Sequence, residues 1–297
     1  MKALAEFVMR GRFQALLVTV LGAGSMMFCW VSAAVVALVT LRKGAGQGAW
    51  LLLWALLPAG TMLYLYAESG PLALLLGTMV LALVLRTTVD LPLAVLASVA
   101  VGAVTGLGLY AFNGQYLEQI IAAFGEFLAN LEQQLSQGGE PVVLARPEAV
   151  QIAGMLGTGT AMMAVLSLLL GRYWQAALYN PGGFGAEFKA LHYPVAVSAA
   201  LALGMVALSS LGLQYRSWAM MCAVPLSFAG IALVHARAGV RGRGKGWLAG
   251  FYLAWLLFDP VKLLVVFVAI ADSWFDFRQR WAASAGSDVD ERRDNED

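Results

Sequence analysis

The sequence predicts an all-α protein, a polytopic membrane bundle of eight to ten membrane segments. Of its 297 residues, 60% are hydrophobic and only 12% are charged, whereas roughly a quarter of the residues of a soluble domain carry charge. The hydrophobic residues are also gathered into long runs between short polar stretches, and a spanning helix needs about 20 such residues. We therefore expect the chain to lie in a lipid bilayer.

Six apolar runs have a length suited to one helix each, because a span can be somewhat shorter than usual where the bilayer thins. They are residues 50–66, 71–85, 91–112, 150–170, 195–213 and 218–234.

Two further runs are too long for one ordinary span, and each is broken near its middle. Gly22 and Gly24 interrupt residues 13–41, and an Asp-Pro pair interrupts residues 247–271. Each run either crosses the membrane once or folds back as two short segments.

Basic residues favour folding back, because Lys and Arg are enriched in cytoplasmic loops. If residues 13–41 crossed once, the basic residues that flank the run would lie on opposite sides. Folding back places them on one side, and it does the same for the basic residues around 247–271. On this topology only Arg146 and Arg216 fall outside, so we predict that both termini are cytoplasmic.

We predict one transmembrane domain, residues 1–280. Its longest connection, residues 113–147, is expected to be an outer loop with an amphipathic helix, since apolar residues recur at helical spacing opposite Glu and Gln. The acidic polar face argues against attraction to anionic headgroups, which leaves packing on the protein's own rim or against a partner helix. Residues 281–297 are polar and are expected to form a disordered cytoplasmic tail.

Charged residues within or beside apolar runs are the first candidates for a ligand site, because charge is costly in a membrane. Asp259 and Lys262 flank Pro260, where a broken helix leaves free backbone groups that only protein or a water-lined cavity can satisfy. Arg86 and Asp90 bracket a turn between two runs. They either contribute to a ligand site or simply pair at the cytoplasmic surface.

A loop of glycine and basic residues joins the last two apolar runs. Residues 239–246 match the GxxxxGK start of a phosphate-binding loop, but Gly246 stands where Ser or Thr is required and no strand precedes the loop. An ordinary positive cytoplasmic loop is the simpler interpretation, and we expect no specific nucleic-acid partner. The cations available to a partner or to lipid headgroups are Arg237, Arg241, Arg243 and Lys245.

Further charges follow the last apolar run. Asp272 and Asp276 lie four residues apart, and Arg278 and Arg280 come soon after, so one helical face can bring carboxylates beside guanidinium groups. We expect an ion-pair cluster at the membrane interface, with Trp274 as an anchor.

Residue types suited to catalysis or metal binding are scarce. The chain has two histidines, His192 and His235, and no GxSxG or HExxH motif. Cys29 and Cys222 each lie inside an apolar run, and their spacing fits neither a CxxC pair nor a zinc site. We therefore expect no enzyme, no metal and no cofactor.

Several local features together resemble the YybS-like family of bacterial multi-pass membrane proteins of unknown function, over nearly the whole chain to about Arg280. The features are a split first segment that ends in Leu-Arg-Lys-Gly at residues 41–44, Gly-Arg-Tyr-Trp-Gln at 171–175 leading to Tyr-Asn-Pro-Gly-Gly at 179–183, and Asp-Pro at 259–260 followed by Asp-Ser-Trp-Phe-Asp-Phe-Arg at 272–278.

That family is similar in membrane architecture to the substrate-binding subunits of energy-coupling-factor transporters. The resemblance implies capture of a vitamin-like small molecule and docking on a separate membrane energising module. This chain departs from a compact six-helix subunit because it has more segments and a long outer amphipathic stretch.

Two functional hypotheses follow. The first is a non-enzymatic multi-pass protein of the bacterial cytoplasmic (inner) membrane, a transporter-like small-molecule-binding subunit with Asp259, Pro260 and Lys262 at its site. The alternative is a non-transporting scaffold that recruits partners through its basic loop and outer amphipathic helix. A polar cavity reached by Asp259 or Lys262 favours the first, and exposure of both at the membrane surface favours the second.

Overall fold

The computed structural model describes residues 2–136, 142–242 and 244–281. Within these ranges the chain forms α-helices and one 3-10 helix and contains no β-strand, which confirms the all-α prediction. The elements in chain order are α1 (Lys2–Arg10), α2 (Arg12–Ala23), α3 (Cys29–Lys43), α4 (Ala45–Tyr66), α5 (Gly70–Thr88), α6 (Leu91–Leu96), α7 (Ser98–Phe112), α8 (Gly114–Ser136), α9 (Ala149–Tyr179), α10 (Gly183–Lys189), α11 (Val195–Ser210), η1 (Leu213–Tyr215), α12 (Arg216–Val240), α13 (Lys245–Leu257) and α14 (Asp259–Phe275).

Among the described residues, 5 helical stretches are long and apolar enough to cross a membrane: α4, α5, α6 with α7, α9, and η1 with α12. The pair formed by α13 and α14 brings the number to 6 if it is taken as one span, although the two helices are bent by 113°. A multi-pass membrane protein is therefore supported, but eight to ten segments are not confirmed. The count of full-length helices is lower than the predicted count of segments because α2 and α11 are apolar but shorter than a full span.

Both long apolar runs are broken into two helices, α2 with α3 and α13 with α14, as the sequence predicts. α2 ends at Ala23 and α3 begins at Cys29, and the buried Ser32 hydroxyl donates to the Thr19 carbonyl at 2.8 Å, which holds the two helices side by side. At the other end of the chain, the Arg237 guanidinium lies 4.4 Å from the ring centroid of Trp281. The segment formed by α13 and α14 thus returns to the end of the bundle from which it started.

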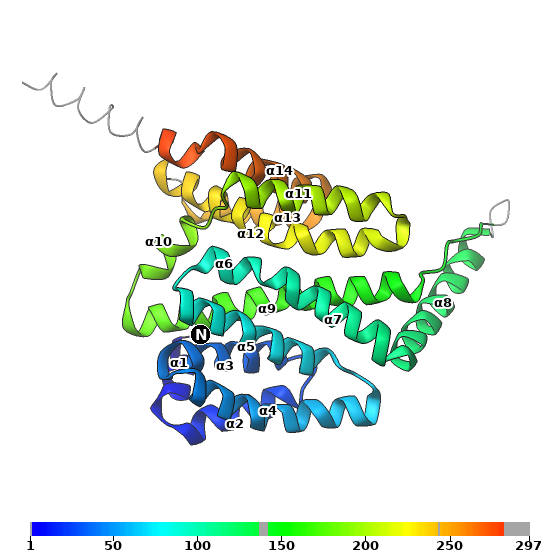
Figure 1. Cartoon of the computed structure of the whole chain (residues 1–297), viewed down its shortest axis with the longest axis horizontal. Helices are drawn as coiled ribbons and strands as arrows, with labels where there is room; N and C mark the ends of the chain where they lie inside the picture. The colour runs from blue at the N-terminus through cyan, green and yellow to red at the C-terminus, as the bar shows by residue number, and fades with distance from the viewer. Residues whose placement is uncertain (1, 137–141, 243, 282–297) are drawn as a thin grey trace, which may run out of the picture.

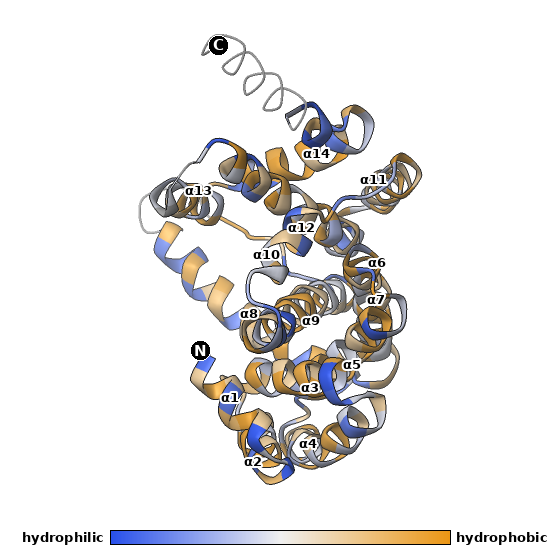
Figure 2. Cartoon of the chain, turned by 90° about the vertical axis from the view of Figure 1, so that its left-hand side faces the viewer, coloured by the Kyte–Doolittle hydropathy of each residue, from blue (hydrophilic) through white to orange (hydrophobic). Residues whose placement is uncertain are grey.

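The helices lie side by side, with α1, α10 and the end of α14 at one end of the bundle and α8 at the other (Figure 1). We call these the terminal end and the α8 end. Figure 2 looks onto the terminal end and shows apolar residues on outward as well as inward faces of the helices. Outward apolar faces are expected where lipid replaces water as the solvent.

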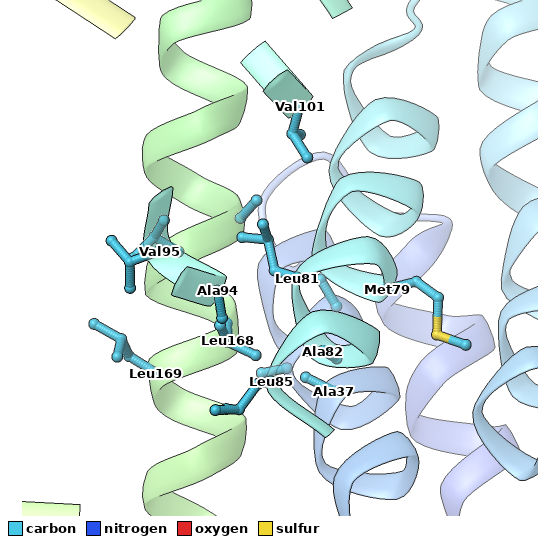
Figure 3. Packing of buried hydrophobic residues seen from close by; sticks show 14 of the residues in the cluster. Ala37, Met79, Leu81, Ala82, Leu85, Ala94, Val95, Val101, Leu168 and Leu169 are labelled. Carbon is cyan, nitrogen blue, oxygen red and sulfur yellow. The ribbon is translucent and has the colours of Figure 1, made fainter. Parts of the chain in front are cut away.

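The core is built around α3 and α9. α3 packs against α2, α4, α5 and α9, and every residue from Ser32 to Leu41 is buried. The close approach of α9 depends on Gly171, since a Cβ there would lie 2.8 Å from the Ala34 carbonyl oxygen. Figure 3 shows Ala37 of α3 and Leu168 of α9 among the packed side chains of this core.

α8 is the amphipathic helix predicted within residues 113–147, and Figure 1 shows it leaving the bundle at an angle. Of its residues only Leu117 is buried. The returning chain lies along it, because Arg146 pairs with Glu132 at 2.8 Å and donates to the Gly125 carbonyl at 2.7 Å. Apart from Trp281, the predicted tail of residues 281–297 lies outside the described residues.

Candidate ligand groove

The charged residues proposed from the sequence at the Asp-Pro break lie at the tip of the α13–α14 pair. Pro260 stands in the first turn of α14, where its missing N–H would have no helical partner. Lys262 Nζ lies 2.7 Å from Asp259 Oδ1, and their side chains are 41% and 87% exposed. The two opposite charges thus pair with each other at the surface. Neither residue lines either of the two cavities described below.

Arg86 and Asp90 do not pair with each other, contrary to one interpretation of the sequence. Arg86 Nη1 donates to the carbonyls of Thr40 at 3.1 Å and Leu41 at 2.8 Å. These carbonyls lie in the last turn of α3, where the Thr40 carbonyl also accepts from the Gly44 N–H at 3.2 Å, and a cation there interacts favourably with the helix dipole. Asp90 Oδ1 accepts from the Leu93 N–H at 3.0 Å as the N-cap of α6. Each side chain therefore caps a helix.

The described residues of the basic loop show no arrangement suited to a phosphate. Arg237 stacks on Trp281, and Arg241 is exposed in the turn after α12. Arg243 and the side chain of Lys245 lie outside the described residues. The described part of this loop is consistent with an ordinary positive loop at the terminal end.

Asp272 is the one buried charged residue in the described chain, with 3% exposure. Arg278 Nε lies 3.2 Å from its Oδ2, and the same guanidinium donates to the carbonyls of Lys189 at 2.8 Å and Leu191 at 2.7 Å. The expected ion-pair cluster is therefore present for Asp272 and Arg278. It fastens the end of α14 to the connection between α10 and α11.

The larger cavity is a groove between α5 and α7, which both pack on α9 but touch each other little. It has a volume of about 560 Å³ and an almost entirely apolar lining. The two walls approach each other closely at Gly77, where Val101 Cγ1 lies 2.5 Å from the place where a Cβ would stand. The walls carry Leu72, Leu76 and Val80 from α5 and Val104, Gly108 and Phe112 from α7.

A second, polar hollow of about 520 Å³ lies at the α8 end of this groove. It is lined by residues 63–67 at the end of α4 and by Asn113, Gln115 and Gln119. Leu63 and Asn113 line both spaces. The two spaces are therefore neighbours, the groove apolar within the bundle and the hollow polar where the bundle ends.

A set of hydrogen bonds holds the rim of the hollow. Asn113 Nδ2 donates to the Ala67 carbonyl at 2.9 Å, and the Tyr116 hydroxyl donates to the Glu68 carboxylate. The second Glu68 oxygen accepts from the Gly70 N–H at 2.8 Å. Burial raises the pKa of Tyr116 well above its usual value, and the hydrogen bond to Glu68 and its negative charge add to the shift. These bonds join the α4–α5 connection to the start of α8.

The sequence did not indicate the groove, because its walls carry no charged residue. The available signal was the junction at which the apolar run 91–112 gives way to Asn113 and Gln115, with the small residue Gly108 one turn before it. That junction marks the border between apolar groove and polar hollow. To identify the groove as a site, one must also know how α5 and α7 pack on α9, which this junction does not indicate.

No family model, curated protein or solved structure matches this chain. The resemblance to the YybS-like family therefore stays a prediction.

Proposed function

We propose that the protein is a non-enzymatic, multi-pass protein of the bacterial cytoplasmic membrane that binds a small molecule with a long apolar part in the groove between α5 and α7. The observation that carries the proposal is the apolar groove of about 560 Å³, within the range of small-molecule sites. The proposal keeps the small-molecule-binding hypothesis but moves the site away from Asp259, Pro260 and Lys262.

The length of the groove suits one lipid chain. Its lining runs from residue 69 to 80 on the α5 side and from 100 to 113 on the α7 side, which at 1.5 Å per residue is roughly 17–20 Å. The hydrocarbon core of a bilayer is about 30 Å thick, so one leaflet spans about 15 Å. An acyl or isoprenoid chain lying along the groove would extend over its length toward the polar hollow.

The proposed orientation places both termini in the cytoplasm, with the α2–α3 and α13–α14 pairs as short fold-backs among eight to ten segments. Support comes from the basic side chains that gather at the terminal end. Arg86 caps α3, Arg42 stacks on Tyr179, and Arg278 binds the α10–α11 connection. Such residues favour the cytoplasmic side. On this orientation the polar hollow opens on the outer face of the membrane.

Filling the groove tests the proposal. Gly108 lines it, and a Cβ there would meet nothing within 4 Å, so Gly108→Leu occupies the groove without forcing helices apart. Gly159 of α9 is a matched control, because a Cβ there also meets nothing and the residue lies outside the lining. The measurement is native mass spectrometry of the protein in short-chain detergent with oleyl alcohol and monooleoylglycerol added.

We expect Gly108→Leu to weaken the binding of both oleyl compounds by about tenfold or more, which corresponds to about 1.4 kcal/mol. Gly159→Leu should bind as the unmodified protein does. Equal binding by all three proteins would overturn the proposal.

A second candidate function is recruitment of a partner, whether a scaffolded protein or a separate energising module. The observation that favours it is α13, none of whose described side chains is buried. A photo-crosslinking residue in place of Leu253, which is 59% exposed, would report the neighbour of this helix in cells. A discrete protein adduct supports the partner, and crosslinks to lipid alone argue against it.

A further inference from the structure

We infer that the ligand of the groove is a lipid with an uncharged, hydroxyl-rich head group, and that the polar hollow at the α8 end binds this head group. The inference rests on the proposed function, because the head is held only if the chain lies in the groove. Because Leu63 and Asn113 border both spaces, a molecule whose chain lies in the groove would place its head group beside the hollow.

The first argument is the kind of polar group in the hollow. Its lining includes Tyr64, Tyr66, Gln115 and Gln119, and it includes no Lys, Arg, Asp or Glu. Carboxamides offer both donors and acceptors, and phenols can act as either. Hydroxyl groups of a ligand match this set because each also donates and accepts.

The second argument is that charged head groups would find no counter-charge. Glu68, next to the hollow in sequence, is bonded to Tyr116 and to the Gly70 N–H. Arg146, the cation that contacts α8, is bonded to Glu132 and to the Gly125 carbonyl. A phosphate placed in the hollow would lose hydration without gaining an ion pair, which is unfavourable, and no carboxylate lines the hollow to bind an ammonium.

The third argument is that the lining groups are free to bind. No hydrogen bond within the described chain engages the side chains of Gln115, Gln119, Tyr64 or Tyr66, whereas Asn113 beside them is bonded to Ala67. The Tyr64 side chain is 88% exposed and that of Tyr66 64%. Their ring faces carry partial negative charge, which suits contact with the C–H groups of a polyol.

The test uses lipids that share one monounsaturated 18-carbon chain and differ in the head. Monooleoylglycerol carries an uncharged diol, oleoyl lysophosphatidic acid carries a phosphate, and oleyl alcohol carries a single hydroxyl. Dissociation constants are measured by native mass spectrometry for the unmodified protein, Gly108→Leu, and the double variant Gln115→Leu with Gln119→Leu. Gln133→Leu with Gln134→Leu, exposed on the same helix outside the hollow, is the matched control.

We expect monooleoylglycerol to bind about tenfold more tightly than lysophosphatidic acid, and the double variant to reduce this preference to about twofold. Oleyl alcohol should bind equally well to the double variant and to the control. If the double variant does not fold, Tyr64→Ala serves in its place, because that ring is largely exposed.

The outcomes separate the two proposals. Equal or tighter binding of lysophosphatidic acid, or a preference that survives the double variant, overturns the uncharged head group while loss of binding in Gly108→Leu still supports the groove. If Gly108→Leu binds every lipid as the unmodified protein does, the groove itself is not the site and both proposals fail.

Discussion

α3 and α13 are both short apolar helices, of 15 and 13 residues, yet their surroundings are opposite. α3 is enclosed by α1, α2, α4, α5 and α9, and it is buried from Ser32 to Leu41. α13 packs mainly on α12 and α14, and none of its described side chains is buried. Apolar character alone therefore does not distinguish a central helix from a peripheral one.

The size of the side chains does distinguish them. The buried part of α3 is mostly Ala and Val, whereas α13 carries two Trp, a Phe and a Tyr. Small side chains let membrane helices approach closely, and lipid fills the space around large ones without requiring a fit. Small side chains therefore indicate a central helix and large ones a peripheral helix. The following experiments test that conclusion.

The largest expected effect is truncation within α3. Leu38 is fully buried, so Leu38→Ala should lower the free energy of unfolding by about 2–5 kcal/mol through lost contacts and a cavity. Leu253→Ala on α13, at a side chain that is 59% exposed, should change it by less than about 0.5 kcal/mol. Denaturant unfolding in mixed micelles measures both, and equal effects would contradict the contrast between the two helices.

The next effect concerns the attachment of the α13–α14 pair. Arg278→Met leaves the carboxylate of Asp272 buried without its ion pair, and we expect a loss of about 3 kcal/mol. Adding Asp272→Asn should restore much of the loss, because no charge then remains buried. Arg241→Met, in an exposed turn, is the control. If Arg241→Met lowered the free energy of unfolding as much as Arg278→Met does, the Asp272–Arg278 ion pair would have no special role in stability.

Glycine replacements should give effects of opposite sign in the two regions. Gly171→Ala brings a methyl group to 2.8 Å from the Ala34 carbonyl oxygen of α3, and overpacking of this kind costs about 1–3 kcal/mol. At Gly250 of α13 a Cβ meets nothing within 4 Å, so Gly250→Ala should stabilise by up to about 1 kcal/mol through helix propensity. Thermal unfolding of the two variants checks the signs.

The smallest effect concerns the rim of the polar hollow. Tyr116→Phe removes the hydrogen bond to Glu68 and should cost about 1 kcal/mol near neutral pH. Because the folded-state pKa of Tyr116 is raised, its contribution is complete below the unfolded value of about 10 and is lost as pH rises above it. The difference in melting temperature between the two proteins should therefore shrink between pH 8 and pH 10.5. A constant difference would contradict this account.

The breaks in the chain could be predicted from the sequence, because glycines and an Asp-Pro pair interrupt helices through local backbone chemistry. The amphipathic pattern of α8 is equally local. Eight to ten membrane segments are not confirmed, since α11 ends at Ser210 and not at residue 213, and α2 ends at Ala23. Residues at the ends of apolar runs do not show by hydropathy alone whether they remain helical.

The roles of the charged residues depended on contacts distant in the chain. Arg86 caps α3 through the Leu41 carbonyl, 45 positions away, and Arg278 reaches Leu191, 87 positions away. The groove is harder still to predict, because it exists only where α5 and α7 both pack on α9 and make few contacts with each other. No pattern within a single helix encodes such a gap.

The length of α9 has a consequence for where its last turns reside. A helix of 31 residues is about 46 Å long, whereas the hydrocarbon core is about 30 Å thick and helix tilts rarely exceed about 40°. This hydrophobic mismatch forces part of α9 out of the hydrocarbon, and the end that holds Arg172 and Gln175 is the one suited to leave it. The Arg172–Glu187 pair, with its 2.7 Å separation, then stands in the headgroup layer, where dissolved salt weakens it. The connection between α9 and α10 should accordingly become more mobile as ionic strength rises, while the helices within the hydrocarbon should not.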